Sequence, residues 1–235
     1  MRAEDLERIA ARHWQPPETE RLGEWLLRAA AGFTGRANSV LPLGDPGVPL
    51  PEAVTLVEDW YRRRDLPPMI VLFQGAARDP LENLLAERAW VPRPRPALVM
   101  TAAIADLPAP SPDTGVRMDP EPDPAWLALY RYRGQDLPPI ARTLLLSAPW
   151  QAFASIRRAG RAVAVGRVSV ADQWGVITAA LAAAAADRGA RQVLLQVETG
   201  NTPARALYAR CGFRDSHHYR YRVAPWAGPA LSLRL

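Results

Sequence analysis

Hydrogen-bonding and titratable side chains gather near the end of the chain, between residues 196 and 222. Asn201 precedes an expected short helix, Tyr208 lies two turns along it, and Glu198 ends the expected strand before it. An amide and a phenol offer hydrogen bonds, a phenol is also an acid with a pKa of about 10, and the glutamate is a candidate base. The structural alternatives are an asparagine in a turn, a packed tyrosine and a solvated glutamate.

The segment 217–222, with the sequence HHYRYR, alternates in the manner of a strand. Alternation puts His217, Tyr219 and Tyr221 on one face, because successive strand side chains point to opposite sides. That face either lines a pocket, with a histidine that titrates near neutral pH, or packs as a half-buried strand.

The elements that must position these residues alternate between helix and strand, which indicates an α/β fold with a mixed sheet. Strands are expected at 24–29, 36–43, 69–73 and 192–196, and helices at 51–66 and 174–189 and within 78–90 and 201–213. In the last two segments, Asp79 and Thr202 are the expected N-caps, and each precedes a proline suited to the first helical position.

The two halves of the chain share this order of elements. Residues 78–90 match residues 201–213 at three positions, and the same offset sets 51–66 over 174–189 and 69–73 over 192–196. The pattern of helix, strand, helix and strand therefore occurs twice, which indicates a duplicated unit.

The copies differ at the polar positions. Arg78 stands opposite Asn201 and Leu85 opposite Tyr208, so the first copy keeps the apolar skeleton without the amide and the phenol. This difference favours a functional site in the second copy and a degenerate first copy.

Composition is that of a globular protein with two units. The chain has 235 residues, of which 49% are hydrophobic and 23% charged. A proline-rich segment at 105–115 is typical of a linker, so we expect domains at 1–108 and 109–235.

The net charge of +5 comes from arginine alone, because the sequence contains no lysine. The arginines are scattered among acidic residues and prolines and form no basic stripe, so nucleic-acid binding is the weakest interpretation. Such a surface favours an anionic ligand, for example a phosphorylated cofactor.

The remaining sequence features concern cellular location, the single cysteine and three tryptophans. The charged start lacks an apolar leader and no apolar run is long enough to span a membrane, so we expect a cytoplasmic protein without membrane contact. The single cysteine, Cys211, is expected to be a small buried hydrophobe. Trp126, Trp150 and Trp174 are assigned to the core, with a homodimer interface as the alternative.

The segment 193–213, VLLQVETGNTPARALYARCGF, resembles the C-terminal core motif of the GCN5-related N-acetyltransferases, the GNAT superfamily. The matching positions of the pattern N-x-x-A-x-x-L-Y-x-x-x-G-F are Asn201, Ala204, Leu207, Tyr208, Gly212 and Phe213. Residues 162–170 resemble the family's central antiparallel strand, and the whole chain is similar to tandem GNAT proteins of actinobacteria, some of them labelled N-acetylglutamate synthases. The resemblance implies a tandem GNAT fold.

The resemblance also implies a reaction and roles for these residues. An amine attacks the thioester of acetyl-CoA, the co-substrate, and Tyr208 protonates the leaving CoA thiolate. Asn201, Ala204, Leu207 and Tyr208 would contact the cofactor. For Glu198 the role is that of the base, and for His217 and Tyr219 that of lining the pocket of a small-molecule amine.

One departure from the family concerns the cofactor phosphates. GNAT proteins bind them with a loop like R-x-x-G-x-G at the start of a helix, and this sequence lacks that loop. Only five residues separate Val170 from Val176, so we expect the family's fourth strand to be missing as well. Either the protein has lost the segment, or the printed sequence omits residues of the real polypeptide.

Three functions follow. The leading one is an acetyl-CoA-dependent N-acetyltransferase with a catalytic second half. The alternatives are a non-catalytic relic that senses acyl-CoA or binds a protein, and nucleic-acid binding through arginines.

Overall fold

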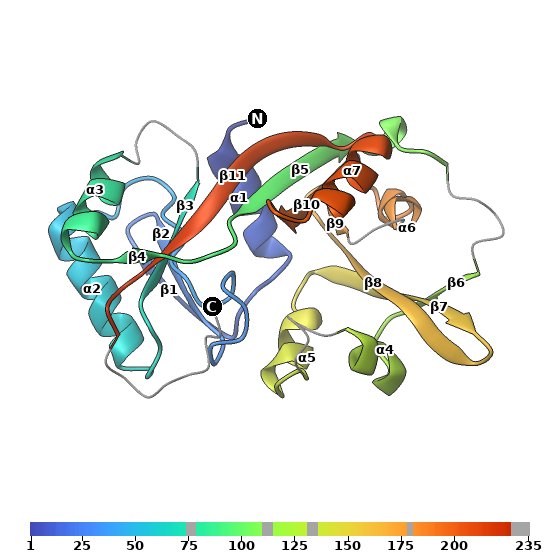
Figure 1. Ribbon diagram of the computed structural model, residues 1–235, viewed down its shortest axis with the longest axis horizontal. Coiled ribbons are helices and arrows are strands. Elements are labelled where there is room, and N and C mark those ends of the chain that lie inside the picture. The colour runs from blue at the N-terminus through green and yellow to red at the C-terminus, as the bar shows by residue number, and fades with distance from the viewer. Residues whose placement is uncertain (74–78, 110–114, 131–135, 178–180, 227–235) are drawn as a thin grey trace.

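The computed structural model describes residues 1–73, 79–109, 115–130, 136–177 and 181–226 (Figure 1). The first half contains α1 (Ala3–Arg12), β1 (Glu18–Leu22), β2 (Trp25–Ala29), α2 (Leu50–Arg62), β3 (Met69–Phe73), α3 (Asp79–Glu87), β4 (Val91–Pro92) and β5 (Ala97–Ala103), followed by a 3-10 turn at Ile104–Asp106. The strand expected at 69–73 and the helix expected at 51–66 are confirmed. The strand expected at 36–43 is wrong, since Val40 and Leu41 form only isolated bridges there.

The second half contains β6 (Val116–Asp119), α4 (Pro124–Leu129), α5 (Ile140–Leu145), β7 (Trp150–Arg158), β8 (Arg161–Ala171), β9 (Trp174–Ile177), α6 (Ala182–Ala186), β10 (Gln192–Glu198), α7 (Thr202–Arg210) and β11 (Arg214–Val223). The strands expected at 162–170 and 192–196 are confirmed as β8 and β10. Part of the expected linker, residues 110–114, lies outside the described residues.

Nine of the described strands form one mixed sheet, which confirms the predicted fold class. Their order is β3, β11, β5, β10, β9, β8, β7 and β6, with β4 paired to β11. Neighbours are antiparallel except β9 and β10, which run parallel. A separate hairpin of β1 and β2 lies beside α2 in Figure 1.

The two halves exchange strands at the centre of this sheet. The repeated order of helix, strand, helix and strand is present as α2, β3, α3 and β4–β5, and again as α6, β10, α7 and β11. The last strand of each copy pairs with the other copy, because β11 lies between β3 and β5, and β5 lies between β11 and β10. The domain boundary at residue 108 stays a prediction.

Residues 171–177 correct two expectations. Asp172 and Gln173 have positive φ angles of 50° and 63° and make a two-residue turn from β8 into β9. A tight turn of this type uses the fewest residues and follows the twist of its strands. The fourth strand that we expected to be missing is therefore present, and the helix expected at 174–189 is wrong over its first part. Pairing with β8 and β10 outweighs the helical preference of the sequence.

Packing joins the two halves through α1. The first half has its own core around Trp25, Trp60 and Trp90, whereas Leu6 of α1 packs against Trp174 of β9 and Leu194 of β10. As expected, Trp126 and Trp174 are buried. No helix in the described ranges combines the length and the apolar character that a membrane crossing requires.

Candidate active site

Asn201 caps the helix that carries Tyr208. Its Oδ1 accepts a hydrogen bond from the Ala204 N–H at 3.2 Å, and its own N–H donates to the Glu198 carbonyl at 2.9 Å. The helix therefore begins at Thr202 with the proline in its first turn, and the expectation that Thr202 is the cap is wrong. The amide is held at the junction of β10 and α7 because it satisfies a free helix N–H.

Replacing Asn201 with alanine is expected to lower the free energy of unfolding by about 1 kcal/mol, the usual worth of an N-cap. Asn201→Asp is the matched control, because aspartate caps equally well and cannot donate from its side chain. If the amide also binds CoA, affinity falls in both variants. Calorimetric titration with CoA and thermal unfolding measure the two effects, and unchanged affinity in both variants would leave Asn201 with the capping role alone.

Tyr208 is half-buried on α7. Its ring meets Phe213 edge to face at 6.0 Å between centroids and packs on the second-half core. Burial raises the pKa of the phenol, with a smaller contribution from Cys211. The interpretation of Tyr208 as a proton donor and the alternative of a packed tyrosine both stay predictions. A protonated phenol is suited to donate a proton.

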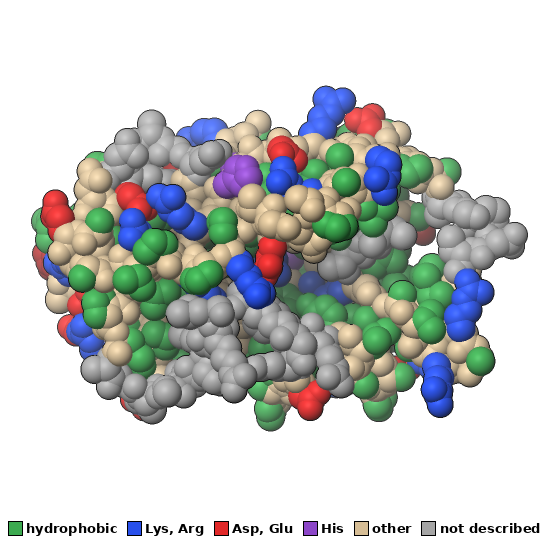
Figure 2. Space-filling view, in the orientation of Figure 1, with side chains coloured by type: hydrophobic (Ala, Val, Ile, Leu, Met, Phe, Trp, Pro, Cys, Tyr) green, Lys and Arg blue, Asp and Glu red, His purple; other side chains and the backbone are tan. Residues whose placement is uncertain are grey.

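The sheet opens beside this helix. β9 and β10 pair only through residues 174–176 and 192–194, and β10 then continues to Glu198 with a partner only on its β5 side in the described structure. Figure 2 shows the surface hollowed to the right of centre, between the region of α7 and that of α4 and α5. The backbone of residues 195–197 therefore presents hydrogen-bonding groups that a bound molecule could use.

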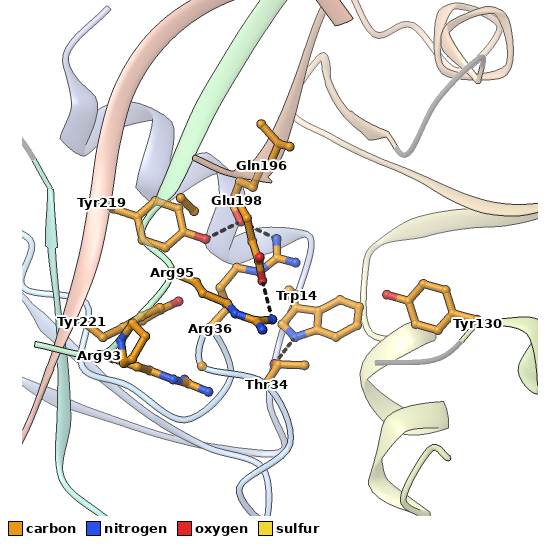
Figure 3. Close-up of a pocket in the computed structure, with 14 residues that line it drawn as sticks. Trp14, Thr34, Arg36, Arg93, Arg95, Tyr130, Gln196, Glu198, Tyr219 and Tyr221 are labelled. Atoms are coloured by element: carbon orange, nitrogen blue, oxygen red, sulfur yellow. Dashed lines mark hydrogen bonds and ion pairs between the residues drawn. The ribbon is translucent and has the colours of Figure 1, made fainter. Parts of the chain in front are cut away.

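A pocket of about 210 Å³ lies at the C-terminal end of β10 (Figure 3). Its side chains come from six segments of the chain. They are Gln196 and Glu198 of β10, Tyr219 and Tyr221 of β11, Arg93 and Arg95 before β5, Trp14 and Arg36 after α1 and β2, and Tyr130 after α4. None of these segments could form the pocket alone.

Hydrogen bonds fix the inner wall of the pocket. Gln196 Oε1 accepts from Arg36 and, at 3.3 Å, from the Tyr219 hydroxyl. At the rim, Arg95 Nη1 lies 3.8 Å from Glu198 Oε1, and both side chains are about half exposed. Burial raises the pKa of both Tyr219 and Tyr221, so both phenols are neutral donors.

The structure separates the residues predicted for the acceptor site. Glu198 and Tyr219 line the pocket, and His217 and Tyr219 share one face of β11 as the alternation predicted. His217 is nevertheless outside the pocket, contrary to our expectation, because its Nε2 lies 3.0 Å from Glu7 Oε1 under α1. Ala204 packs partly buried on the second-half core and Leu207 is 44% exposed; their contacts with a cofactor stay predictions.

Sequence reasoning missed the arginines and Gln196. The pair Arg93 and Arg95 is visible as the string RPRP before a strand, and Gln196 lies two residues before Glu198, on the same face of β10. Arg36 carries no local signal. It reaches the site only through the fold, from a residue 160 positions away from Gln196.

A buried histidine lies behind the pocket residue Trp14. His13 Nδ1 is 3.0 Å from Ser169 Oγ, and burial, with Arg167 and Arg12 nearby, lowers the pKa of His13 from 6.5 to about 4. Stability from neutral His13 is therefore complete above pH 6.5 and lost as the pH falls towards 4.

We expect the free energy of unfolding to fall between these pH values by up to roughly 3 kcal/mol because of His13. His13→Gln should lack this part of the pH dependence, and His218→Gln, at a partly exposed position, should keep it. Urea unfolding at pH 7, 5.5 and 4.5 measures the slope. A His13→Gln slope equal to that of the wild type would refute the assignment.

The segment that would bind the phosphates of CoA, between β9 and α6, lies largely outside the described residues. The sequence from β9 to α6 runs through Thr178, Ala179 and Ala180, which lie outside them, and contains no glycine. The absence of an R-x-x-G-x-G loop thus stands as a property of the sequence.

A family model described as "Probable histone acetyltransferase Rv0428c C-terminal" matches residues 2–175. The chain belongs to this acetyltransferase family. A relative named "Probable histone acetyltransferase Rv0428c", from Mycobacterium tuberculosis, is 30% identical over 244 residues, which cover 95% of this chain and 74% of the relative. "Uncharacterized N-acetyltransferase YobR" of Bacillus subtilis is 25% identical, with 92% of this chain and 97% of the relative covered.

Solved structures give the same family fold. A GCN5-related N-acetyltransferase from Kribbella flavida superposes with a TM-score of 0.63 at 16% identity, covering 96% of each chain. A tandem GNAT protein from the clavulanic acid biosynthesis pathway gives a TM-score of 0.55 at 14% identity, over 96% of this chain and 89% of that one. The predicted GNAT resemblance is confirmed, and the family is that of N-acetyltransferases.

Proposed function

We propose that this protein transfers an acetyl group from acetyl-CoA to a primary amine by direct attack. The observation that carries the proposal is the half-buried phenol of Tyr208, whose pKa is raised by burial. It lies on the helix that follows the free end of β10. Membership of an acetyltransferase family supports the reaction class.

The residues present fit the acetyl end of the cofactor. The edge of residues 195–197 that faces away from β5 would hold the pantetheine arm, with Asn201, Ala204 and Leu207 along α7. Acetyl-CoA supplies an activated acetyl group and a thiolate leaving group. Tyr208 donates its proton to that sulfur, since a phenol remains protonated at neutral pH and matches a thiolate in basicity.

Glu198 is the proposed base. It lies at the pocket rim about half exposed, and among the described residues its one ion pair is the loose one with Arg95 at 3.8 Å. Exposed pairs of this kind are weak, so the carboxylate stays available to accept a proton from the amine, directly or through a water. Glu198 ends β10 and Tyr208 lies in the second turn of α7, so one short connection joins the elements that carry the proposed base and acid.

The missing phosphate-binding loop favours a second function. Without a glycine-rich loop after β9 the cofactor's phosphates lose their usual backbone donors, which suits a protein that senses acyl-CoA or binds a protein without turnover. Each alignment with the two relatives spans 244 positions, gaps included, which exceeds the 235 residues of this chain. Each relative therefore has residues without a counterpart here.

The test combines intact mass, binding and turnover. The intact mass of the purified protein is compared with 25.9 kDa. The protein is then titrated with acetyl-CoA and assayed for thiol release with free amino acids, polyamines, aminoglycosides and lysine-containing peptides. Release of CoA that depends on an amine supports the transferase. Binding of acetyl-CoA without release, at the expected mass, supports the second function.

A further inference from the structure

The pocket at the end of β10 carries an excess of positive charge. Arg36, Arg93 and Arg95 line it, against Glu198 as the one acidic residue among its described lining residues. Guanidinium groups cannot lose their charge in proteins. A pocket with this charge therefore favours an anion, and Glu198 at the rim favours a cationic amine on the same molecule.

Arg93 is the least compensated of the three. It is 7% exposed, and its Nε is buried without a hydrogen-bond partner in the described structure. Its Nη1 reaches only the sulfur of Met69, at 3.6 Å, which is a weak acceptor. A buried charge without a carboxylate partner is costly, because desolvation is not offset by a counter-charge.

The fold holds this guanidinium in place. The Arg93 N–H donates to the Tyr221 carbonyl at 2.9 Å, and the guanidinium lies 5.8 Å from the Tyr221 ring centroid. A Cβ on Gly35 would come within 2.7 Å of Nη1, so a glycine is needed for this close approach. The position of the charge is therefore built by three segments.

Gln196 supplies a second free donor. Its Oε1 is occupied by Arg36 and Tyr219, which fixes the orientation of the amide and leaves Nε2 buried without a partner among the described residues. Two unpaired buried donors, Arg93 Nε and Gln196 Nε2, thus belong to the lining of one pocket. Buried donors are normally satisfied, so a bound acceptor group is indicated.

We propose that the acceptor is a small amino carboxylate, such as a free amino acid, whose carboxylate binds at Arg93 and Gln196 and whose amine faces Glu198. This inference rests on the proposed function. The pocket, about 210 Å³, is smaller than the roughly 300–1,000 Å³ of sites for drug-sized ligands. A carboxylate is favoured over a phosphate, because no described lining residue belongs to a helix N-terminus and a planar carboxylate matches a guanidinium fork.

The test compares ligands that differ only in the carboxylate. Full-length protein is titrated calorimetrically with glycine, L-alanine, L-glutamate, L-alaninamide, ethylamine and phosphoethanolamine, with and without CoA. At least one free amino acid is expected to bind at least 10-fold more tightly than the amide or amine. Equal binding of the amide or ethylamine, tighter binding of phosphoethanolamine, or no binding of any amino acid would overturn the proposal.

Variants assign the binding to the pocket. Arg93→Gln is expected to weaken amino-acid binding about 10- to 100-fold and to leave alaninamide binding unchanged, since a charge-assisted bond is lost. Arg220→Gln is the control, because Arg220 lies on β11 next to Tyr221, pairs with Glu82 and is 54% exposed. Unchanged amino-acid affinity in a folded Arg93→Gln protein refutes the placement. If that variant does not fold, Gln196→Leu takes its place with the same expectation.

The outcomes separate this inference from the proposed function. Acetylation of amines that lack a carboxylate, with no preference for amino acids, would support the transferase and refute the amino carboxylate. Amino acids that bind at Arg93 without acetylation would support the carboxylate site and refute the transferase.

Discussion

Replacing Tyr208 with phenylalanine is expected to lower kcat for acetyl transfer by about 100-fold or more and to leave CoA affinity nearly unchanged. General acid catalysis commonly contributes a factor of roughly 10²–10⁴. The ring keeps its packing on Phe213, whereas the proton donor is lost. Because burial raises the pKa of Tyr208, ionisation of this phenol should not limit the wild-type rate at neutral pH.

Single-turnover thiol release and calorimetric titration with CoA separate the rate from binding. Tyr61→Phe is the control, since Tyr61 is buried in the first-half core and donates to the Arg28 carbonyl at 2.8 Å. This control should lose stability and keep its turnover per folded molecule. A Tyr208→Phe enzyme with the wild-type kcat would remove Tyr208 from the acid role.

Neither half of the chain is expected to fold alone when it is divided at residue 108. The fragment 109–235 lacks β3 and β5, so β11 loses both neighbours and β10 loses the partner of all its seven residues. The fragment 1–108 likewise leaves β5 without a neighbour on either side. Unpaired backbone in a sheet is costly, and an exposed strand edge promotes aggregation.

Each fragment alone should give no cooperative unfolding transition, and an equimolar mixture refolded together should recover one. Circular dichroism during thermal unfolding and gel filtration report both states, with the full chain as reference. A cooperative, monomeric fragment 109–235 would show instead that the second half is an autonomous domain.

Local patterns in the sequence determined the elements whose partners could be anticipated. The apolar run 69–73 forms β3, because such a segment is stable only when both of its faces are covered, and all five of its residues are buried. The helix that carries Tyr208 forms within the predicted segment 201–213, although Asn201 caps it in place of Thr202. The duplicated order of elements and the GNAT motif were also readable, since both depend on spacing along the chain.

The tertiary structure decided what depends on partners distant in sequence. Residues 174–177 became a strand rather than a helix, because β8 and β10 offered pairing on both sides. For the same reason His217 lies under α1, where Glu7 is its partner, and not in the pocket. Local preference is worth less than such pairing and burial, so these outcomes were hidden from a local reading.

The acceptor pocket shows the limit most clearly. Glu198 and Tyr219 were predicted from their own segments, whereas Arg36 and Arg93 enter the site through loops whose course is set by the exchanged strands. The sequence by itself determined the family motif, the capped helix with its phenol and the excess of arginine. Only the folded chain determined that two residues with unpaired buried donors, Arg93 and Gln196, line one cavity, because a pocket is made by long-range contacts and leaves no periodic signal along the chain.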